Sequence, residues 1–126
     1  MSRRLVELAR ARLAADAGVT ALVSARLFPN KLPQATTLPA VVLSVISDVP
    51  SESLDGFVGL RRARLQVDAY DRTYDGAQAL ADAIFAVLGD VATPDFASLQ
   101  GQRRDLYEDQ STNHRASQDF IIWTRE

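Results

Sequence analysis

Three residues near the C-terminal end of the sequence have the side-chain types of a hydrolase triad: His114, Ser117 and Asp119. In such a triad the histidine takes the proton of the serine hydroxyl, and the carboxylate orients the histidine. Residues 114–125, HRASQDFIIWTR, have the composition of a β-strand, in which side chains an odd number of residues apart point to opposite faces. His114 therefore faces away from both Ser117 and Asp119, and we expect no catalytic site and no enzyme activity.

The second candidate site is a group of carboxylates. Asp68, Asp71 and Asp75 could supply the oxygen ligands that Mg²⁺ prefers, but each also has an ordinary local role at the end of a strand or in the first turn of a helix. The sequence has no cysteine, which excludes disulfides and thiolate zinc sites. It contains neither a P-loop nor a dinucleotide-binding fingerprint. We expect no metal and no cofactor.

The arginines are the remaining candidates for a functional site, because their side chains can form ion pairs or bind phosphate groups. Five of them fall in two groups. Arg61, Arg62 and Arg64 lie in the stretch LRRARLQVDAY, residues 60–70, and Arg103 and Arg104 lie in QGQRRD. The formal net charge of the chain is -2, so no overall field draws it toward nucleic acid. Acidic residues interleave with the arginines, which favours ion pairs within a sheet or between proteins. A solvated face and direct contact with DNA are the alternatives.

The alternation of side chains in this stretch decides what kind of element carries the arginines. Ala63, Leu65, Val67 and Ala69 point to one face of a strand, and Arg62, Arg64, Gln66, Asp68 and Tyr70 point to the other. Such alternation is typical of a sheet with one covered face. Residues 60–71 are therefore first of all a strand. The segment before them, PSESLDGFVG, is polar and contains glycine, which predicts a loop or the tip of a long hairpin. The preceding strand is AVVLSVISDV.

Two helices are predicted before this hairpin. Residues 3–14 have apolar side chains at helical spacing, namely Leu5, Leu8, Ala9 and Leu13. A short helix follows over AGVTALVS, with Asp16 as its N-cap and with Val19, Leu22 and Val23 on one side. Three prolines are spaced through ARLFPNKLPQATTLPA, which predicts an extended connector without a helix.

A long helix is predicted after the hairpin. It begins after the N-cap Thr73, has Asp75 in its first turn, and ends at Gly89. Its apolar stripe is expected to cover the sheet and consists of Ala77, Leu80, Ala81, Ile84, Phe85 and Leu88. After a turn around Pro94, residues 96–109 and 114–125 read as two more strands.

These elements predict one α+β domain over residues 1–126. It would contain a mostly antiparallel sheet of about four strands, packed by one long helix, with two N-terminal helices. The N-terminal segment lacks the uninterrupted apolar region of a secretory signal, and no stretch is long enough to span a bilayer. We expect no membrane partner.

Three segments in this order resemble the tail completion (tail terminator) proteins of long-tailed bacteriophages and gene transfer agents. They are ADAGVTALVSARLFPNKLPQATTLPAVVLSVIS, GLRRARLQVDAYDRTYDGAQALADAIFAVL and RDLYEDQSTNHRASQDFIIW. The shared features include the VTALV helix, the LP before the first long strand, the R-x-Q-V-D-x-Y strand and a late tryptophan. The resemblance covers residues 16–123.

The resemblance implies a structural virion protein at the head-proximal end of the tail, present in the bacterial cytoplasm during assembly. Such proteins cap the finished tail tube, usually as a ring of six copies, and offer a surface for joining the head. The implied partners are other copies of the chain, the tail tube protein and the head–tail connector. We expect interface contacts from Leu54, Phe57, Val58, Arg62 and Arg64, and contacts with the lumen or with passing DNA from Arg61, Arg103 and Arg104. The alternative is a small nucleic-acid-binding module that uses the arginine-bearing strand face.

Overall fold

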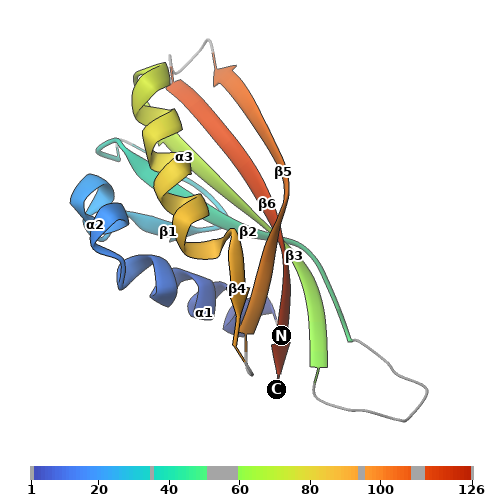
Figure 1. Ribbon diagram of the computed structural model, residues 1–126. Helices are drawn as coiled ribbons and strands as arrows, with labels where there is room; N and C mark the ends of the chain where they lie inside the picture. The colour runs from blue at the N-terminus through green and yellow to red at the C-terminus, as the bar shows by residue number, and fades with distance from the viewer. Residues whose placement is uncertain (1, 35, 51–59, 94–95, 109–112, 126) are drawn as a thin grey trace.

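The centre of the molecule is a six-stranded sheet (Figure 1). The computed structural model describes residues 2–34, 36–50, 60–93, 96–108 and 113–125. The strand order is β1-β2-β3-β6-β5-β4. β1 is parallel to β2, and every other neighbouring pair is antiparallel. The strands are β1 (Leu27–Pro29), β2 (Ala40–Pro50), β3 (Leu60–Asp71), β4 (Asp90–Ala92), β5 (Phe96–Glu108) and β6 (Asn113–Arg125).

The prediction of an α+β fold is confirmed, but the prediction of about four strands is wrong, because β1 and β4 add two. Each of them is three residues long, which is too short for a hydrophobic alternation to be recognised. β1 lies within the proline-containing segment that we interpreted as a connector. Its flanking backbone is tied to β2, because Val41 N donates to Arg26 O at 3.0 Å and Asn30 N donates to Leu43 O at 2.8 Å.

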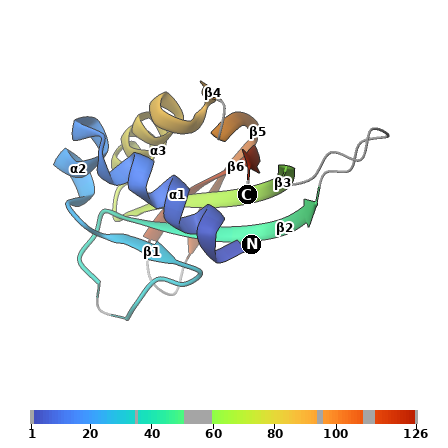
Figure 2. The same ribbon diagram turned by 90° about the horizontal axis from the view of Figure 1, so that it is seen from below.

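Three helices lie on one side of the sheet (Figure 2). They are α1 (Ser2–Ala14), α2 (Ala17–Val23) and α3 (Tyr74–Leu88). α3 contacts β3 and β6, whereas α1 contacts β2. The long helix α3 therefore does not cover the sheet alone, because α1 covers the β2 side. We call the other side of the sheet, on which no helix of the described residues lies, the open face.

β3 shows the alternation that the sequence predicted. Ala63, Leu65, Val67 and Ala69 are at most 4% exposed beneath the helices, and Arg62 and the even-numbered residues after it point to the open face. The same alternation continues on β6, where Ala116, Phe120 and Ile122 belong to the core. The largest fully buried side chains are Phe120, Leu13, Leu27, Leu43, Leu65, Leu80, Ile84, Leu88 and Ile122.

The predicted starts of α2 and α3 are confirmed by their N-caps. A side-chain oxygen of Asp16 accepts from Val19 N at 3.0 Å, and Thr73 Oγ1 accepts from Gly76 N at 3.0 Å. Two apolar residues predicted to face inward are instead partly in solvent, since Leu22 is 38% and Phe85 is 44% exposed. Each is adjacent in sequence to a fully buried residue and lies about 100° around the helix from it, at the edge of the apolar stripe.

Candidate functional site

The three triad residues are separated by the sheet itself. His114 lies on the helix side, where its ring centroid is 4.7 Å from that of Tyr107 and 6.1 Å from that of Tyr74. Ser117 is buried on the open face, and Asp119 is bound there by Arg64. The prediction that the histidine faces away from both is confirmed, so these three residues form no triad.

The three aspartates do not form a group that could hold a metal ion. Asp68 is 3% exposed on the open face. Its Oδ2 atom accepts from Gln66 Nε2 at 2.9 Å and lies 3.8 Å from Arg115 Nη1. Asp71 accepts from the backbone N of the next residue at 2.7 Å, and Asp75 lies in the first turn of α3. Within the described ranges, no group of three acidic or histidine side chains is placed to hold a metal ion.

Arg115 and Tyr70 form a polar pair beside Asp68. Arg115 Nη1 donates to the phenolic oxygen of Tyr70 at 3.3 Å. Burial raises the pKa of Tyr70 above its ordinary value of 10.0, although the hydrogen bond from Arg115 acts in the opposite direction. Burial lowers the pKa of Arg115, but the hydrogen bond to Tyr70 and the charge of Asp68 outweigh this and leave the pKa raised. The pair therefore keeps a charged guanidinium and a neutral phenol at neutral pH.

The predicted arginine group does not form one surface. Arg62 and Arg104 are exposed on the open face, and Arg64 is bound to Asp119 with an N–O distance of 2.7 Å. Arg103 lies on the other side of the sheet, where α3 holds it. The side chain of Arg61 lies outside the described residues, as do the interface candidates Leu54, Phe57 and Val58. A continuous track for a phosphate backbone is therefore absent from the arginines that the structure describes.

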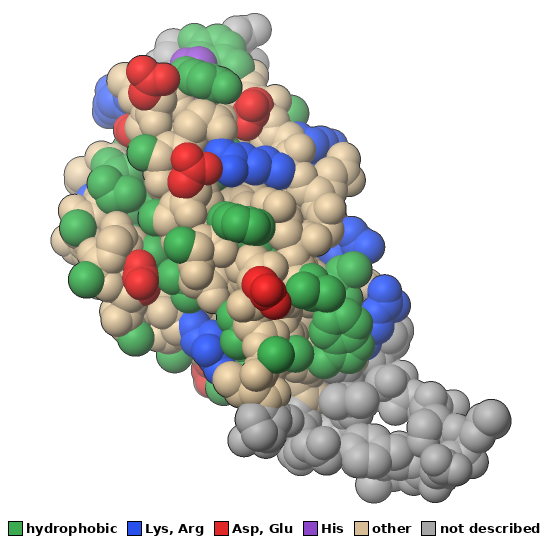
Figure 3. Space-filling view, in the orientation of Figure 1, with side chains coloured by type: hydrophobic (Ala, Val, Ile, Leu, Met, Phe, Trp, Pro, Cys, Tyr) green, Lys and Arg blue, Asp and Glu red, His purple; other side chains and the backbone are tan. Residues whose placement is uncertain are grey.

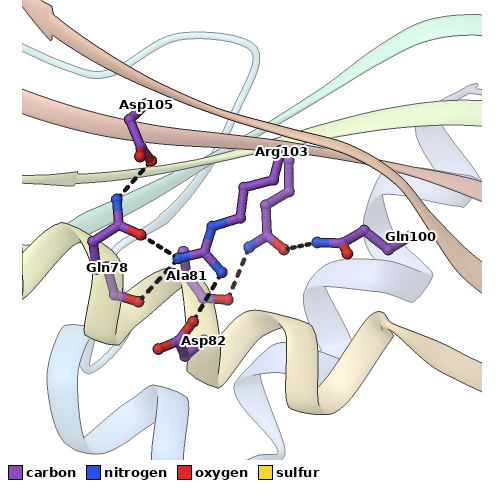
Figure 4. Close-up of polar contacts among 7 residues, drawn as sticks. Gln78, Ala81, Asp82, Gln100, Arg103 and Asp105 are labelled. Carbon is purple, nitrogen blue, oxygen red and sulfur yellow. Dashed lines mark hydrogen bonds and ion pairs between the residues drawn. The ribbon is translucent and has the colours of Figure 1, made fainter.

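Arg103 belongs to a group of polar contacts between β5 and α3 (Figure 4). Its Nη1 donates to Asp82 Oδ1 at 2.8 Å, and its Nη2 donates to the side-chain oxygen of Gln78 at 2.5 Å. Gln78 Nε2 donates to Asp105 Oδ1 at 2.6 Å. Next to this group, the buried Gln118 donates to Ala81 O at 2.8 Å. These contacts fix the part of β5 after Gln100 against the helix.

A glycine bulge in β5 reverses the direction of the side chains along the strand. The register between β5 and β6 shifts between Gln100 and Gln102, which leaves Gly101 as the extra residue. Asp119 Oδ1 accepts from Gln102 N at 2.6 Å, and Asp119 Oδ2 accepts from Arg64 at 2.7 Å. A Cβ atom on Gly101 would lie 2.5 Å from Asp119 Oδ1. Asp119 therefore joins β3, β6 and β5 on the open face, and the glycine makes room for it.

Parts of β2 and β5 have no neighbouring strand on their outer side. β1 pairs with β2 only at residues 41–43, although β2 extends to Pro50. β4 pairs with β5 only at residues 97–99, although β5 extends to Glu108. In the described parts of the chain, no strand borders the rest of β2 or of β5 on its outer edge. These two stretches lie at opposite edges of the sheet, and we call them the uncovered edges: residues 44–50 of β2 and residues 101–108 of β5.

A groove runs along the uncovered edge of β2. It has a volume of about 780 Å³ and lies between α1, which contributes Val6, Glu7 and Arg10, and residues 45–48 of β2. Ile46, the extra residue of a bulge in β2, is 53% exposed here. The sequence signal for this feature is the pair of adjacent apolar residues in VISD, which breaks the alternation of the strand. We did not predict a groove from that signal.

Apolar side chains also gather on the open face of the sheet. Leu99 is 48% exposed, and it is paired across the strands with Ile121, while Ala97 is paired with Trp123. Figure 3 shows hydrophobic side chains gathered at the lower right of the molecule, with basic side chains along the same edge. No helix of the described residues is long and apolar enough to cross a bilayer. An apolar patch rimmed by charge is typical of a protein–protein contact.

Comparisons with known proteins identify the fold and the family of the chain. A solved structure described as "Virion of native gene transfer agent (GTA) particle" contains a chain with the same fold, at a TM-score of 0.69 and 14% sequence identity. The alignment covers 94% of this chain and 92% of that chain. A search of curated proteins gives no match. The model of the family described as "Tail completion protein gp17" matches residues 9–125. The chain therefore belongs to the tail completion protein gp17 family, and it is a structural protein of a phage-like virion tail.

Proposed function

We propose that the chain forms a ring that caps the head-proximal end of the tail tube, stops polymerisation of the tube and provides the surface to which the head is joined. The main observation that supports a ring is the presence of the two uncovered edges. A contact between two different surfaces of neighbouring copies closes into a ring when its rotation closes. The uncovered edge of β2 on one copy and that of β5 on the next are two such surfaces.

The strand directions suit this pairing. β2 and β6 run in one direction through the sheet, and β3 and β5 run in the other. Copies related by rotation about a ring axis keep these directions, so β5 of one copy lies antiparallel to β2 of the next. Antiparallel pairing satisfies the main-chain donors and acceptors of both edges. Uncovered edges are otherwise a liability that leads to aggregation.

The positions of the two edges also set the tilt of the strands. Ser47 of β2 is level with Leu99 of β5, because both are aligned through Arg64 and Ile121. The middle of the uncovered edge of β5 lies about five residues further along, or ~16 Å. Four strands span ~19 Å across one copy. The two lengths give a tilt of about 40°, which is within the roughly 35–45° of closed barrels. In this register β1 and β4 lie beyond the ends of the paired stretch.

We propose the other partners from the resemblance to tail completion proteins. The ring, of six copies, would meet the tail tube protein on one side and the head–tail connector on the other. In this arrangement Leu54, Phe57 and Val58 contact a neighbouring copy or the tube, together with Arg62 and Arg64. The lumen contacts with passing DNA would come from Arg61 and Arg104, because α3 binds the guanidinium of Arg103. These contacts would be independent of DNA sequence.

Disulfide cross-linking tests the ring, because the chain has no cysteine of its own. Ser47→Cys is combined in turn with Gln102→Cys, Arg104→Cys or Leu106→Cys, whose side chains all lie on the open face. Directly opposed residues in an antiparallel pair have Cα separations that a disulfide can bridge. We expect one of the three combinations to give covalent ladders up to a closed ring in assembled tails, as measured by denaturing electrophoresis.

The control uses the same strand. Ser47→Cys with Asp105→Cys places the second sulfur on the opposite face of the sheet, and we expect no ladder. If rings are present by electron microscopy but none of the three combinations cross-links, the pairing of the edges is wrong and the ring remains. If tail ends carry no ring of this chain, the proposed function itself is wrong.

A further inference from the structure

Two exposed tyrosines and the histidine form a small pocket at the end of the sheet where α3 begins. Tyr74 and Tyr107 are each 52% exposed, and His114 lies between them with edge-on and tilted ring contacts. The cavity beside these rings has a volume of about 240 Å³ and is also lined by Asp105. We call it the tyrosine pocket and define it by these four residues. Figure 3 shows the histidine at the top of the molecule among hydrophobic side chains.

Two exposed carboxylates lie near the tyrosine pocket, and the nearby guanidinium of Arg103 is bound by Asp82. Asp105 and Asp75 are exposed, one on β5 and the other in the first turn of α3. Asp105 accepts a hydrogen bond from the neutral amide of Gln78, which leaves its charge uncompensated by that contact. Arg115 also lines the cavity, but its guanidinium interacts with Asp68 and Tyr70 on the open face. The pocket therefore presents aromatic rings and negative charge.

We infer that the tyrosine pocket is a docking site for an arginine or lysine side chain of a protein partner. A cation is attracted to the faces of tyrosine rings and to a nearby carboxylate. Exposed tyrosines around a small cavity are also typical of the residues that contribute most to a protein interface. The same acidic residues exclude nucleic acid from this surface, because they repel phosphate groups.

The inference rests on the proposed function and adds a surface to it. The ring would close through the edges of the sheet. Asp105 and Tyr107 belong to the uncovered edge of β5, but their side chains point to the helix side, and the cavity that they share with Tyr74 and His114 lies at an end of the strands. An end of the strands faces along the ring axis, toward the tube or toward the head. We therefore place the occupant, a basic side chain, on a protein that meets the ring axially.

Complementation of a producing strain with this chain deleted tests the inference. The strain is supplied with the wild-type chain or with one of five variants: Tyr107→Ala, Tyr107→Phe, Asp105→Asn, Asp105→Arg or Phe85→Ala. Electron microscopy counts the heads joined to tails and measures tail lengths, and quantitative mass spectrometry measures the amount of the chain on each tail. Thermal unfolding of the purified variants confirms that they fold, since every altered side chain is exposed.

We expect Tyr107→Ala and Asp105→Arg to lower either the joined heads or the chain per tail at least tenfold, and Asp105→Asn to have a smaller effect in the same direction. Tyr107→Phe keeps the ring and should assemble normally. Phe85→Ala removes another exposed aromatic side chain of α3 and should also assemble normally. The inference is wrong if Tyr107→Ala and Asp105→Arg restore assembly fully, or if Phe85→Ala fails as they do. Normal particles in the deletion strain itself would instead overturn the proposed function.

Discussion

Replacement of Phe120 by alanine is expected to lower the free energy of unfolding by about 3–5 kcal/mol. Phe120 has no exposed surface and is the largest of the fully buried side chains. It lies on β6, where its neighbours across the strands are Leu65 and Gln100. The loss combines the transfer of the ring to water with the cavity that remains, because close-packed neighbours relax only partly. It would remove a large part of the ~5–15 kcal/mol that typically stabilises a domain.

Denaturant unfolding of the purified chain measures this loss, and a second phenylalanine provides the matched control. Phe85 on α3 is 44% exposed, so Phe85→Ala leaves little cavity and should cost less than about 1.5 kcal/mol. A similar loss for both variants would contradict the core described here. So would a loss below about 1 kcal/mol for Phe120→Ala.

Replacement of Gly101 by alanine is expected to cost about 1–3 kcal/mol, although this residue is exposed. The added Cβ would lie 2.5 Å from Asp119 Oδ1, so the carboxylate has to move away. Its bonds to Gln102 N and to Arg64 are then lost or lengthened. Arg64 is 39% exposed, so water compensates part of the ion pair, and most of the cost falls on the bulge and its backbone N–H.

A double-mutant cycle separates this mechanism from a general strain of the bulge. Asp119→Ala removes the atom with which the new Cβ collides. In that background we expect Gly101→Ala to cost less than half of what it costs in the wild type, as measured by denaturant unfolding. Equal costs in the two backgrounds would show that the contact with Asp119 does not determine why this position is a glycine.

The long elements were predictable because each has a pattern that repeats over many residues. The alternation in β3 identified both the strand and its covered face, and the caps Asp16 and Thr73 set the starts of α2 and α3. A hydrophobic stripe does not show whether a residue at its edge is buried or exposed. This is why the sequence placed Leu22 and Phe85 on the inward face, although both are partly exposed. The family was recognisable from the order of segments along the chain, since none of the single motifs is specific.

The features that build the candidate surfaces come from contacts between distant residues. Gly101 and Asp119 are on different strands, and the roles of both depend on a shift of one residue in the register. The uncovered edges exist because β1 and β4 are each only three residues long. A strand of three residues is too short to show a hydrophobic alternation in the sequence, so neither strand was predicted. The tyrosine pocket joins α3, β5 and β6. The division of the arginines between two faces likewise follows from the bulge, which places Arg103 toward α3.

Imaging of particles from a producing strain that lacks this chain tests the central claim most directly. A ring that ends the tube and joins the head is required both for a defined tail length and for attachment. We therefore expect electron micrographs to show DNA-filled heads without tails, beside separate tails of abnormal or uncontrolled length. Restoring the chain should restore joined particles of normal length. Normal, joined particles in its absence would contradict the proposed capping function.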